Sequence, residues 1–257
     1  MALITYLQWF EQEHPQFKIK DEEKRLQDTS TPSSDTTKLQ QPPRMLVKLG
    51  VDHWEQIAQT CLENAKKNSS LNSQLGGLDK NAALGTEADV VRLAAEHLTG
   101  PLMSTLNAIY PKALIEFSEQ GLQGLRADYA IKTTDSAEFT VILVEYKRCG
   151  YIREHEFEMA SCDEKDLDSA LQDLADSKKP CSLTKNSNAW CFVKQATSYH
   201  RRSKCKYIAL CDYEHLILIR FRGHMDLKAA EVTIVPRSKF RKALLGFAIE
   251  GYENRAR

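Results

Sequence analysis

Charged side chains follow an apolar run in the middle of the sequence. The segment from Phe139 to Val144 is apolar at both parities and rich in β-branched and aliphatic residues, which is typical of a central strand covered on both faces. Because side chains alternate along a strand, Glu145 and Lys147 project from one face at its end, with Tyr146 on the other. An acid and a base are therefore expected on the same wall of the protein.

A second acid precedes this strand. The run from Arg126 to Lys132 also has the character of a strand, and the polar residues 133–137 between the two runs favour a turn. A hairpin of this kind places Asp128 nearly opposite the end of the apolar strand, within cross-strand reach of Glu145. Two carboxylates and a lysine are then expected to converge.

Converging carboxylates repel one another unless a cation or a proton lies between them. Oxygen ligands suit Mg²⁺ or Mn²⁺, so the pattern predicts a divalent-metal site at Asp128 and Glu145. The alternative interpretation is an ordinary strand end, where Glu145 and Lys147 are solvated or form a salt bridge. Acid-x-Lys tripeptides are common, and the pair alone does not distinguish the two interpretations.

The order of these pieces resembles that of the PD-(D/E)xK nuclease superfamily, whose members share the restriction-endonuclease-like fold. The resemblance covers about Leu84 to Phe221, and the chain looks most similar to stand-alone fungal members. Its matching pieces are Asp128, the tripeptide 145–147 and the later run Lys194-Gln-Ala-Thr-Ser-Tyr199. Ala127 stands where the name-giving proline would be, although many members also lack that proline.

The resemblance implies an α/β fold with a central mixed β-sheet flanked by helices, and metal-dependent hydrolysis of phosphodiester bonds. Asp128 and Glu145 would hold one or two Mg²⁺ or Mn²⁺ ions. Lys147 would orient or deprotonate the attacking water. Gln195 would help to position the site, and Tyr199 would support it or approach the substrate backbone. The expected substrate is nucleic acid, with DNA preferred over RNA.

A further glutamate on the first helix of the domain completes the pattern. Thr86 offers an N-cap to a helix that continues to about Leu98. Glu87 precedes two apolar helix positions by three and four residues, so it is expected to point with the buried stripe, where an unpaired carboxylate is costly. The resemblance makes Glu87 the choice for a third metal ligand and Glu96 the alternative. An acid favoured in the first turn by the helix dipole is the other interpretation.

Two basic segments are candidate contacts to phosphate. Lys plus Arg equals Asp plus Glu at 35 each, so binding to nucleic acid must come from a local patch. The final helix, expected from about Ser238 to Glu250, contributes Arg241 to one patch. The densest basic cluster follows the glutamine-and-tyrosine helix and contains Arg201, Arg202, Lys204 and Lys206. Such a cluster is also compatible with a solvated helix end, where cations face the negative pole of the dipole.

The length of 257 residues suits one large domain or a domain with an appendage. Residues 18–41 have the composition of a linker, and 45–66 have apolar residues at roughly helical spacing. We therefore expect an N-terminal helical extension with a polar linker over 1–75 and a nuclease-like domain over 76–257. Within the domain, residues 148–188 form an acidic insertion, expected to be a solvated outer element because acids beside the site would repel phosphate.

Seven cysteines, odd in number and without a C-x-x-C pair, argue against a disulfide framework and a zinc ribbon. A reducing intracellular compartment, nucleus or cytoplasm, is expected. The sequence has no run of eighteen apolar residues, so no membrane partner is expected. A homodimer is compatible with the function, because a dimer most easily cuts both strands of a duplex. The function from a different class is a catalytically silent module with the nuclease fold that binds nucleic acid or a protein partner.

Overall fold

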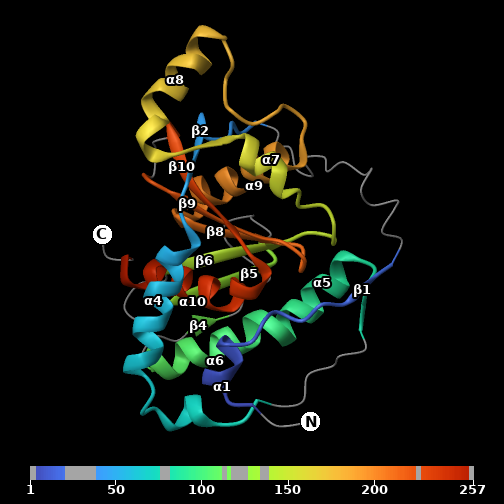
Figure 1. Ribbon diagram of the computed structural model, residues 1–257, viewed down its shortest axis with the longest axis vertical. Helices are drawn as coiled ribbons and strands as arrows, with labels where there is room; N and C mark the ends of the chain where they lie inside the picture. Colours follow the sequence, from blue (N-terminus) through green and yellow to red (C-terminus); the bar gives the residue numbers. More distant parts are fainter. Residues whose placement is uncertain are drawn as a thin grey trace.

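The computed structural model describes residues 4–20, 39–75, 82–111, 115–116, 127–133, 139–223 and 227–254. Within these residues the chain is a mixed α/β protein built on an eight-stranded sheet of order β4-β5-β6-β8-β9-β10-β2-β7 (Figure 1). The strands of this sheet are β2 (Met45–Lys48), β4 (Ile115–Glu116), β5 (Tyr129–Thr133), β6 (Phe139–Tyr146), β7 (Ser161–Cys162), β8 (Tyr207–Cys211), β9 (Leu216–Phe221) and β10 (Ala229–Val235). A separate parallel pair consists of β1 (Lys18–Ile19) and β3 (Ala83–Leu84).

Helices cover both faces of the large sheet (Figure 1). Their bounds are α1 (Tyr6–Phe10), α4 (Val51–Asn64), α5 (Glu87–Ala94), α6 (Gly100–Ile109), α7 (Glu154–Met159), α8 (Leu167–Asp176), α9 (Asn188–Ser203) and α10 (Phe240–Glu253). The helices α4 and α10 pack so closely that a Cβ atom added at Gly246 would lie 1.9 Å from the carbonyl oxygen of Trp54. None of the described helices has the length and apolar character needed to cross a bilayer.

The hairpin expected at the centre of the sequence is confirmed. Strands β5 and β6 pair antiparallel, with Tyr129 opposite Val144. Most of the expected turn, residues 134–138, lies outside the described residues. Val141 to Val144 are at most 1% exposed, as expected of a strand covered on both faces.

The connection from β6 to its parallel neighbour β8 contains α7, β7 and α8 and ends with the helix α9. Strand β8 runs parallel to β6, with Glu145 opposite Leu210, and α9 precedes β8 in the chain. A parallel pair requires such a crossover, which leaves the carboxyl end of one strand and returns to the amino end of the next. The helix α9 therefore begins near the C-terminal end of β6. It ends near the N-terminal end of β8, at the opposite end of these strands.

The expected N-terminal helix over 45–66 is wrong in its first part. Met45–Lys48 forms β2, which lies between β10 and β7, and α4 begins only at Val51. The side chains of Met45 to Val47 are all buried, because both faces of β2 are covered. A short apolar run of this kind cannot be distinguished from part of a helix by its periodicity. Trp9 and Trp54 belong to the main hydrophobic core, so the expected extension over 1–75 and the domain share one core.

The acidic insertion contains its own packed elements. Strand β7 pairs with β2 at the edge of the sheet, and α8 lies at one end of the molecule (Figure 1). A second, smaller apolar cluster joins α8 to the sheet and consists of Met45, Val47, Leu167, Leu171, Leu174 and Ala229. The acids of α8 are exposed while its leucines face this cluster, so the expected outer element is ordered by one apolar face.

Candidate active site

The ends of β5 and β6 bring the two expected strand acids together. Asp128 immediately precedes β5, and the pairing of Tyr129 with Val144 places Asp128 opposite Glu145. The Oδ2 atom of Asp128 accepts a hydrogen bond of 2.7 Å from the backbone N–H of Tyr146. This bond fixes the Asp128 carboxylate against the end of β6.

Glu145 is the centre of a hydrogen-bond network, and only 4% of it is exposed. Its Oε1 atom accepts from Lys147 Nζ at 2.5 Å and from Gln195 Nε2 at 2.6 Å. Its Oε2 atom accepts from the hydroxyl of Tyr199 at 2.6 Å. Gln195 and Tyr199 lie one turn apart on α9, and the amide of Gln195 also donates to the Tyr199 hydroxyl at 2.7 Å. Both oxygens of a buried carboxylate are thereby held in place.

The Tyr199 hydroxyl remains a donor because its environment opposes ionisation. Burial raises the pKa of Tyr199, and the negative charge of Glu145 raises it further. The protonated hydroxyl can therefore give its hydrogen to Glu145 while its oxygen accepts from Gln195.

The Asp128 carboxyl has an unusual protonation equilibrium. Burial raises its pKa, and the neighbouring charge of Glu145 raises it further, to about 7. The backbone N–H of Tyr146 and the charge of Lys147 act in the opposite direction. A cation bound beside Asp128 would favour the ionised form of this carboxyl.

The described residues of this cluster could give a divalent cation two carboxylates but not a complete set of ligands. Among the described residues, no three His, Cys, Asp or Glu side chains gather in a way that could hold a metal ion. The Oδ1 atom of Asp128 accepts no hydrogen bond from the described residues. Mg²⁺ commonly binds one or two carboxylates and keeps waters or substrate phosphates as its other ligands. Asp128 and Glu145 can supply those two carboxylates.

Glu87 lies in the first turn of α5, after the expected N-cap Thr86, whose Oγ1 accepts from the N–H of Asp89. The expectation that Glu87 points with the buried stripe is wrong, because its side chain is exposed. Its charge nevertheless raises the pKa of Asp128. The alternative, Glu96, lies farther along in a π-helical turn beside His97, with 3.9 Å between His97 Nε2 and Glu96 Oε1. Glu87 remains the candidate third acid.

The basic cluster at the C-terminal end of α9 lies away from these acids. Lys206 directly precedes β8, whereas Glu145 is paired with Leu210, four residues farther along that strand. At about 3.3 Å per residue, Lys206 lies about 13 Å along the strand direction from Glu145, toward the N-terminal end of β8. The cluster consists of Arg201, Arg202, Lys204 and Lys206. These side chains cannot all contact the phosphate at which Asp128 and Glu145 would act.

Arg241 serves the interior of the protein rather than a surface for phosphate. Its side chain is 4% exposed, and its Nη1 atom donates to the carbonyl oxygens of Trp9 at 2.8 Å and Gln12 at 3.2 Å. The guanidinium also lies 4.2 Å from the centre of the Trp9 ring. The expected role of Arg241 in nucleic-acid binding is therefore corrected, because this arginine holds the N-terminal segment.

Sequence reasoning missed Asp212, a buried acid that supports the site. Its Oδ2 atom accepts from the N–H groups of Gly150 at 2.9 Å and Ile152 at 3.0 Å, in the loop that follows Lys147. Its Oδ1 atom accepts from the N–H of His215 at 2.8 Å. The available signal was an acid directly after an apolar strand, the same kind of position as that of Glu145.

Comparisons of the chain with protein-family models, with curated proteins and with solved structures found no match. The fold is that of a mixed α/β protein. Two acids and a lysine converge at the end of its central strand β6, next to the helix α9.

Proposed function

We propose that the chain is a metal-dependent nuclease of the PD-(D/E)xK type, which hydrolyses phosphodiester bonds in nucleic acid, with DNA preferred over RNA. The observation that carries the proposal is the convergence of Asp128, Glu145 and Lys147 at the end of β6. The order of the matching pieces supports it as well. Along the chain, Glu87 on α5 comes first, then Asp128 before β5, then Glu145 and Lys147 at the end of β6, and later Gln195 on α9, with α7, β7 and α8 inserted before α9.

Each residue has a defined task in this reaction. Asp128 and Glu145 would hold Mg²⁺ or Mn²⁺, which lowers the pKa of the attacking water and neutralises charge on the phosphate. Lys147 would orient that water or take its proton, and its charge would stabilise the transition state. Gln195 and Tyr199 fix the direction of the Glu145 carboxylate by the bonds described above.

The position of Lys147 is itself restrained. Its ammonium group lies 5.4 Å from the centre of the Phe192 ring on α9, and it donates to Glu145 Oε1. The side chain is therefore held between the strand end and the crossover helix. A positive charge fixed in this way needs little reorganisation when charge develops on a phosphate.

The test is a cleavage assay with purified protein. Labelled single-stranded, duplex and branched DNA, and RNA of the same sequence, are incubated with Mn²⁺, with Mg²⁺ or with chelator. Replacement of Lys147 by Met is expected to reduce metal-dependent cleavage by about 10²–10³-fold, the usual effect of losing one group that stabilises charge in the transition state. Lys165→Met, at an exposed position in the acidic insertion, is the matched control. Undiminished cleavage by the Lys147 variant would remove the assignment.

The second candidate function is a nuclease-fold module without turnover, which binds nucleic acid or a protein partner. One observation favours it: protein donors already engage both oxygens of Glu145. The balance of 35 basic and 35 acidic residues also gives no general attraction to DNA. This function predicts nucleic-acid retention without metal-dependent products, and no heat when Mn²⁺ is titrated into the protein in a calorimeter.

A further inference from the structure

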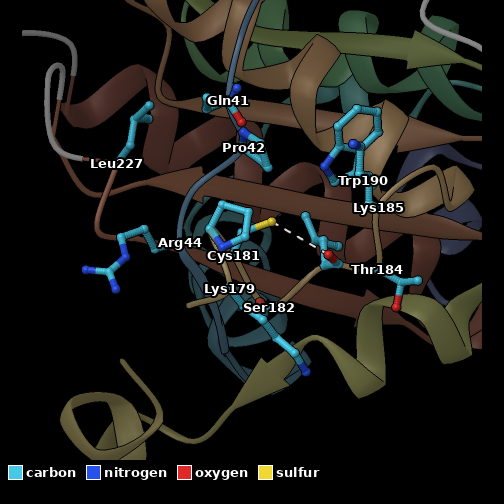
Figure 2. A pocket seen from close by; sticks show the side chains of 12 residues that line it. Gln41, Pro42, Arg44, Lys179, Cys181, Ser182, Thr184, Lys185, Trp190 and Leu227 are labelled. Atoms are coloured by element: carbon cyan, nitrogen blue, oxygen red, sulfur yellow. Dashed lines mark hydrogen bonds between the residues drawn. The ribbon is translucent and has the colours of Figure 1, made fainter. Parts of the chain in front are cut away.

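A hollow of about 810 Å³ lies beside the first turn of α9 (Figure 2). Its walls come from four parts of the chain: residues 41–44, the loop 179–185 before α9, Trp190 on α9, and Leu227. At about 100° per residue, Trp190 lies about 140° around the helix from Gln195, so the hollow is on a different side of α9 from the acid cluster. Its volume is in the range of small-molecule sites.

The polar part of this hollow carries charge of one sign. Arg44, Lys179 and Lys185 line it, and no acid is among the described residues that line it. Since the chain as a whole has zero formal net charge, this excess of cations is local. An anion is the ligand that such a rim attracts.

A further lysine lies behind the indole ring of Trp190. The ammonium group of Lys194 is 4.1 Å from the centre of that ring. Burial lowers the pKa of Lys194, the Cys191 thiol opposes this shift, and the positive charge of Lys185 lowers the pKa further. A bound anion would favour the charged form of Lys194.

Apart from the polar Gln41, Ser182 and Thr184, the remaining walls are mainly apolar and suit a flat ring. Pro42, Pro180, Leu183 and Leu227 line the hollow together with the half-buried indole of Trp190. Lys194 occupies one face of the indole, so a ligand ring would stack on the other. A nucleobase with its flanking phosphates combines a flat π-face with negative charge, and single-stranded nucleic acids are bound by this combination of stacking and cations.

The hollow and the candidate active site both lie near the C-terminal end of β6. The first residue of α9, Asn188, donates through Nδ2 to the carbonyl oxygen of Tyr151 at 2.9 Å, shortly after the end of β6. Phe192, two residues after Trp190, contacts the ammonium group of Lys147. One helix turn thus connects the hollow with the lysine of the site.

We propose that this hollow binds a base and the adjacent phosphates of a single-stranded nucleic-acid segment, with the base on Trp190 and the phosphates on Lys179 and Lys185. The proposal rests on the nuclease function proposed above and gives it a substrate class. The substrate is a nucleic acid with unpaired nucleotides next to the bond that is cut.

Tryptophan fluorescence provides a direct test of binding. Trp9 and Trp54 are at most 1% exposed, so Trp190 is the tryptophan that a ligand can reach. A ten-nucleotide oligothymidylate is titrated into the protein with chelator present, which prevents metal-dependent cleavage. Saturable quenching is expected, and Trp190→Phe should remove the change in fluorescence.

Binding of the same oligonucleotide with a fluorescein label, followed by polarisation, tests the individual contacts. Trp190→Ala is expected to weaken binding by about 5- to 150-fold, the effect of losing one stacked base. Lys179→Gln and Lys185→Gln should each reduce the slope of log affinity against log salt by about 0.7. Both lysines are exposed, so these variants test the proposal even if the Trp190→Ala protein does not fold. Lys66→Gln, exposed after the end of α4, is the matched control and should change neither quantity.

The outcomes separate this proposal from the nuclease itself. Absence of quenching, or unchanged affinity and salt slope in both lysine variants, overturns the proposal. Equal quenching by decaglutamate or by a ten-base-pair duplex also overturns it, because the hollow would then attract anions without selecting an unpaired base. Cleavage without a response of Trp190 removes the hollow but leaves the nuclease. A response of Trp190 without cleavage of any substrate supports the hollow and removes the nuclease.

Discussion

Replacement of Tyr199 by Phe tests the network around Glu145 without altering any proposed metal ligand. The variant removes one hydroxyl group from a residue that is 4% exposed and leaves the ring in place. That hydroxyl donates to Glu145 Oε2 at 2.6 Å and accepts from Gln195 Nε2 at 2.7 Å. Its loss leaves a buried carboxylate with one donor fewer.

The expected cost follows from the charge of the acceptor. A hydrogen bond to an ionised group contributes about 1.5–3 kcal/mol to stability, roughly twice the value for a neutral pair. For a chain of about this length, each kcal/mol lowers the midpoint of thermal unfolding by about 2–4 °C. Tyr199→Phe should therefore lower the free energy of unfolding by about 1.5–3 kcal/mol and the midpoint by about 3–12 °C.

Urea unfolding followed by circular dichroism measures this loss. Tyr6→Phe is the matched control, because the hydroxyl of Tyr6 makes no hydrogen bond to the described residues. A double-mutant cycle with Glu145→Gln should give a coupling energy of about 1 kcal/mol or more between Tyr199 and Glu145. Equal stabilities of the Tyr199 and Tyr6 variants, or strictly additive effects in the cycle, would refute the proposed support of Glu145.

Three further predictions concern other parts of the fold. Burial, and then the charges of two nearby arginines, lower the pKa of His14 well below 6.5, so the unfolded chain binds a proton there that the folded chain does not. The contribution of His14 to stability should fall as pH drops below about 6.5, by up to about 1.4 kcal/mol per pH unit, and it opposes the contribution of Asp128, whose pKa is raised. In urea unfolding at several pH values, His14→Leu should lose this fall in stability and exposed His155→Gln should keep it. Gly246→Ala should destabilise the protein by at least about 1–3 kcal/mol because its Cβ would collide with the backbone of α4, whereas Gly50→Ala meets nothing within 4 Å. Asp212→Ala should reduce stability by at least about 3 kcal/mol, because the N–H groups of Gly150, Ile152 and His215 lose their acceptor. The variant should also slow cleavage. Unchanged stability would contradict the supporting role of Asp212.

The acid cluster could be predicted because its geometry is local. Alternation along a strand places Glu145 and Lys147 on one face, and a hairpin of suitable length brings Asp128 opposite. In the structure Tyr129 pairs with Val144, which places Asp128 opposite Glu145, and Lys147 donates to Glu145. The bonds from Gln195 and Tyr199 to Glu145 span 50 and 54 residues of sequence, so these contacts were expected from the resemblance and not from local geometry. Whether these residues catalyse hydrolysis is a separate matter, which the cleavage assay addresses.

Features that depend on distant packing could not be predicted in the same way. The cations at the C-terminal end of α9 follow Tyr199 closely in the sequence, yet they lie toward the end of the sheet where β8 begins, away from Glu145. Arg241 has basic neighbours in the sequence and was expected at the surface, but it turns inward to the backbone of Trp9. Met45–Lys48 was expected to be helical because only the arrival of β10 and β7 on its two sides makes it a strand.

The position of β2 has a consequence for how the chain reaches its native state. Met45–Lys48 pairs in parallel with Ala229–Val232, and the hydroxyl of Thr233 donates to the carbonyl oxygen of Leu49 across 184 residues of sequence. Contacts of such long range form late, because the entropy of closing a large loop must be overcome first. On the ribosome, β2 leaves the exit tunnel long before its partner has been synthesised. Its three buried apolar side chains must therefore be kept from wrong partners until β10 appears.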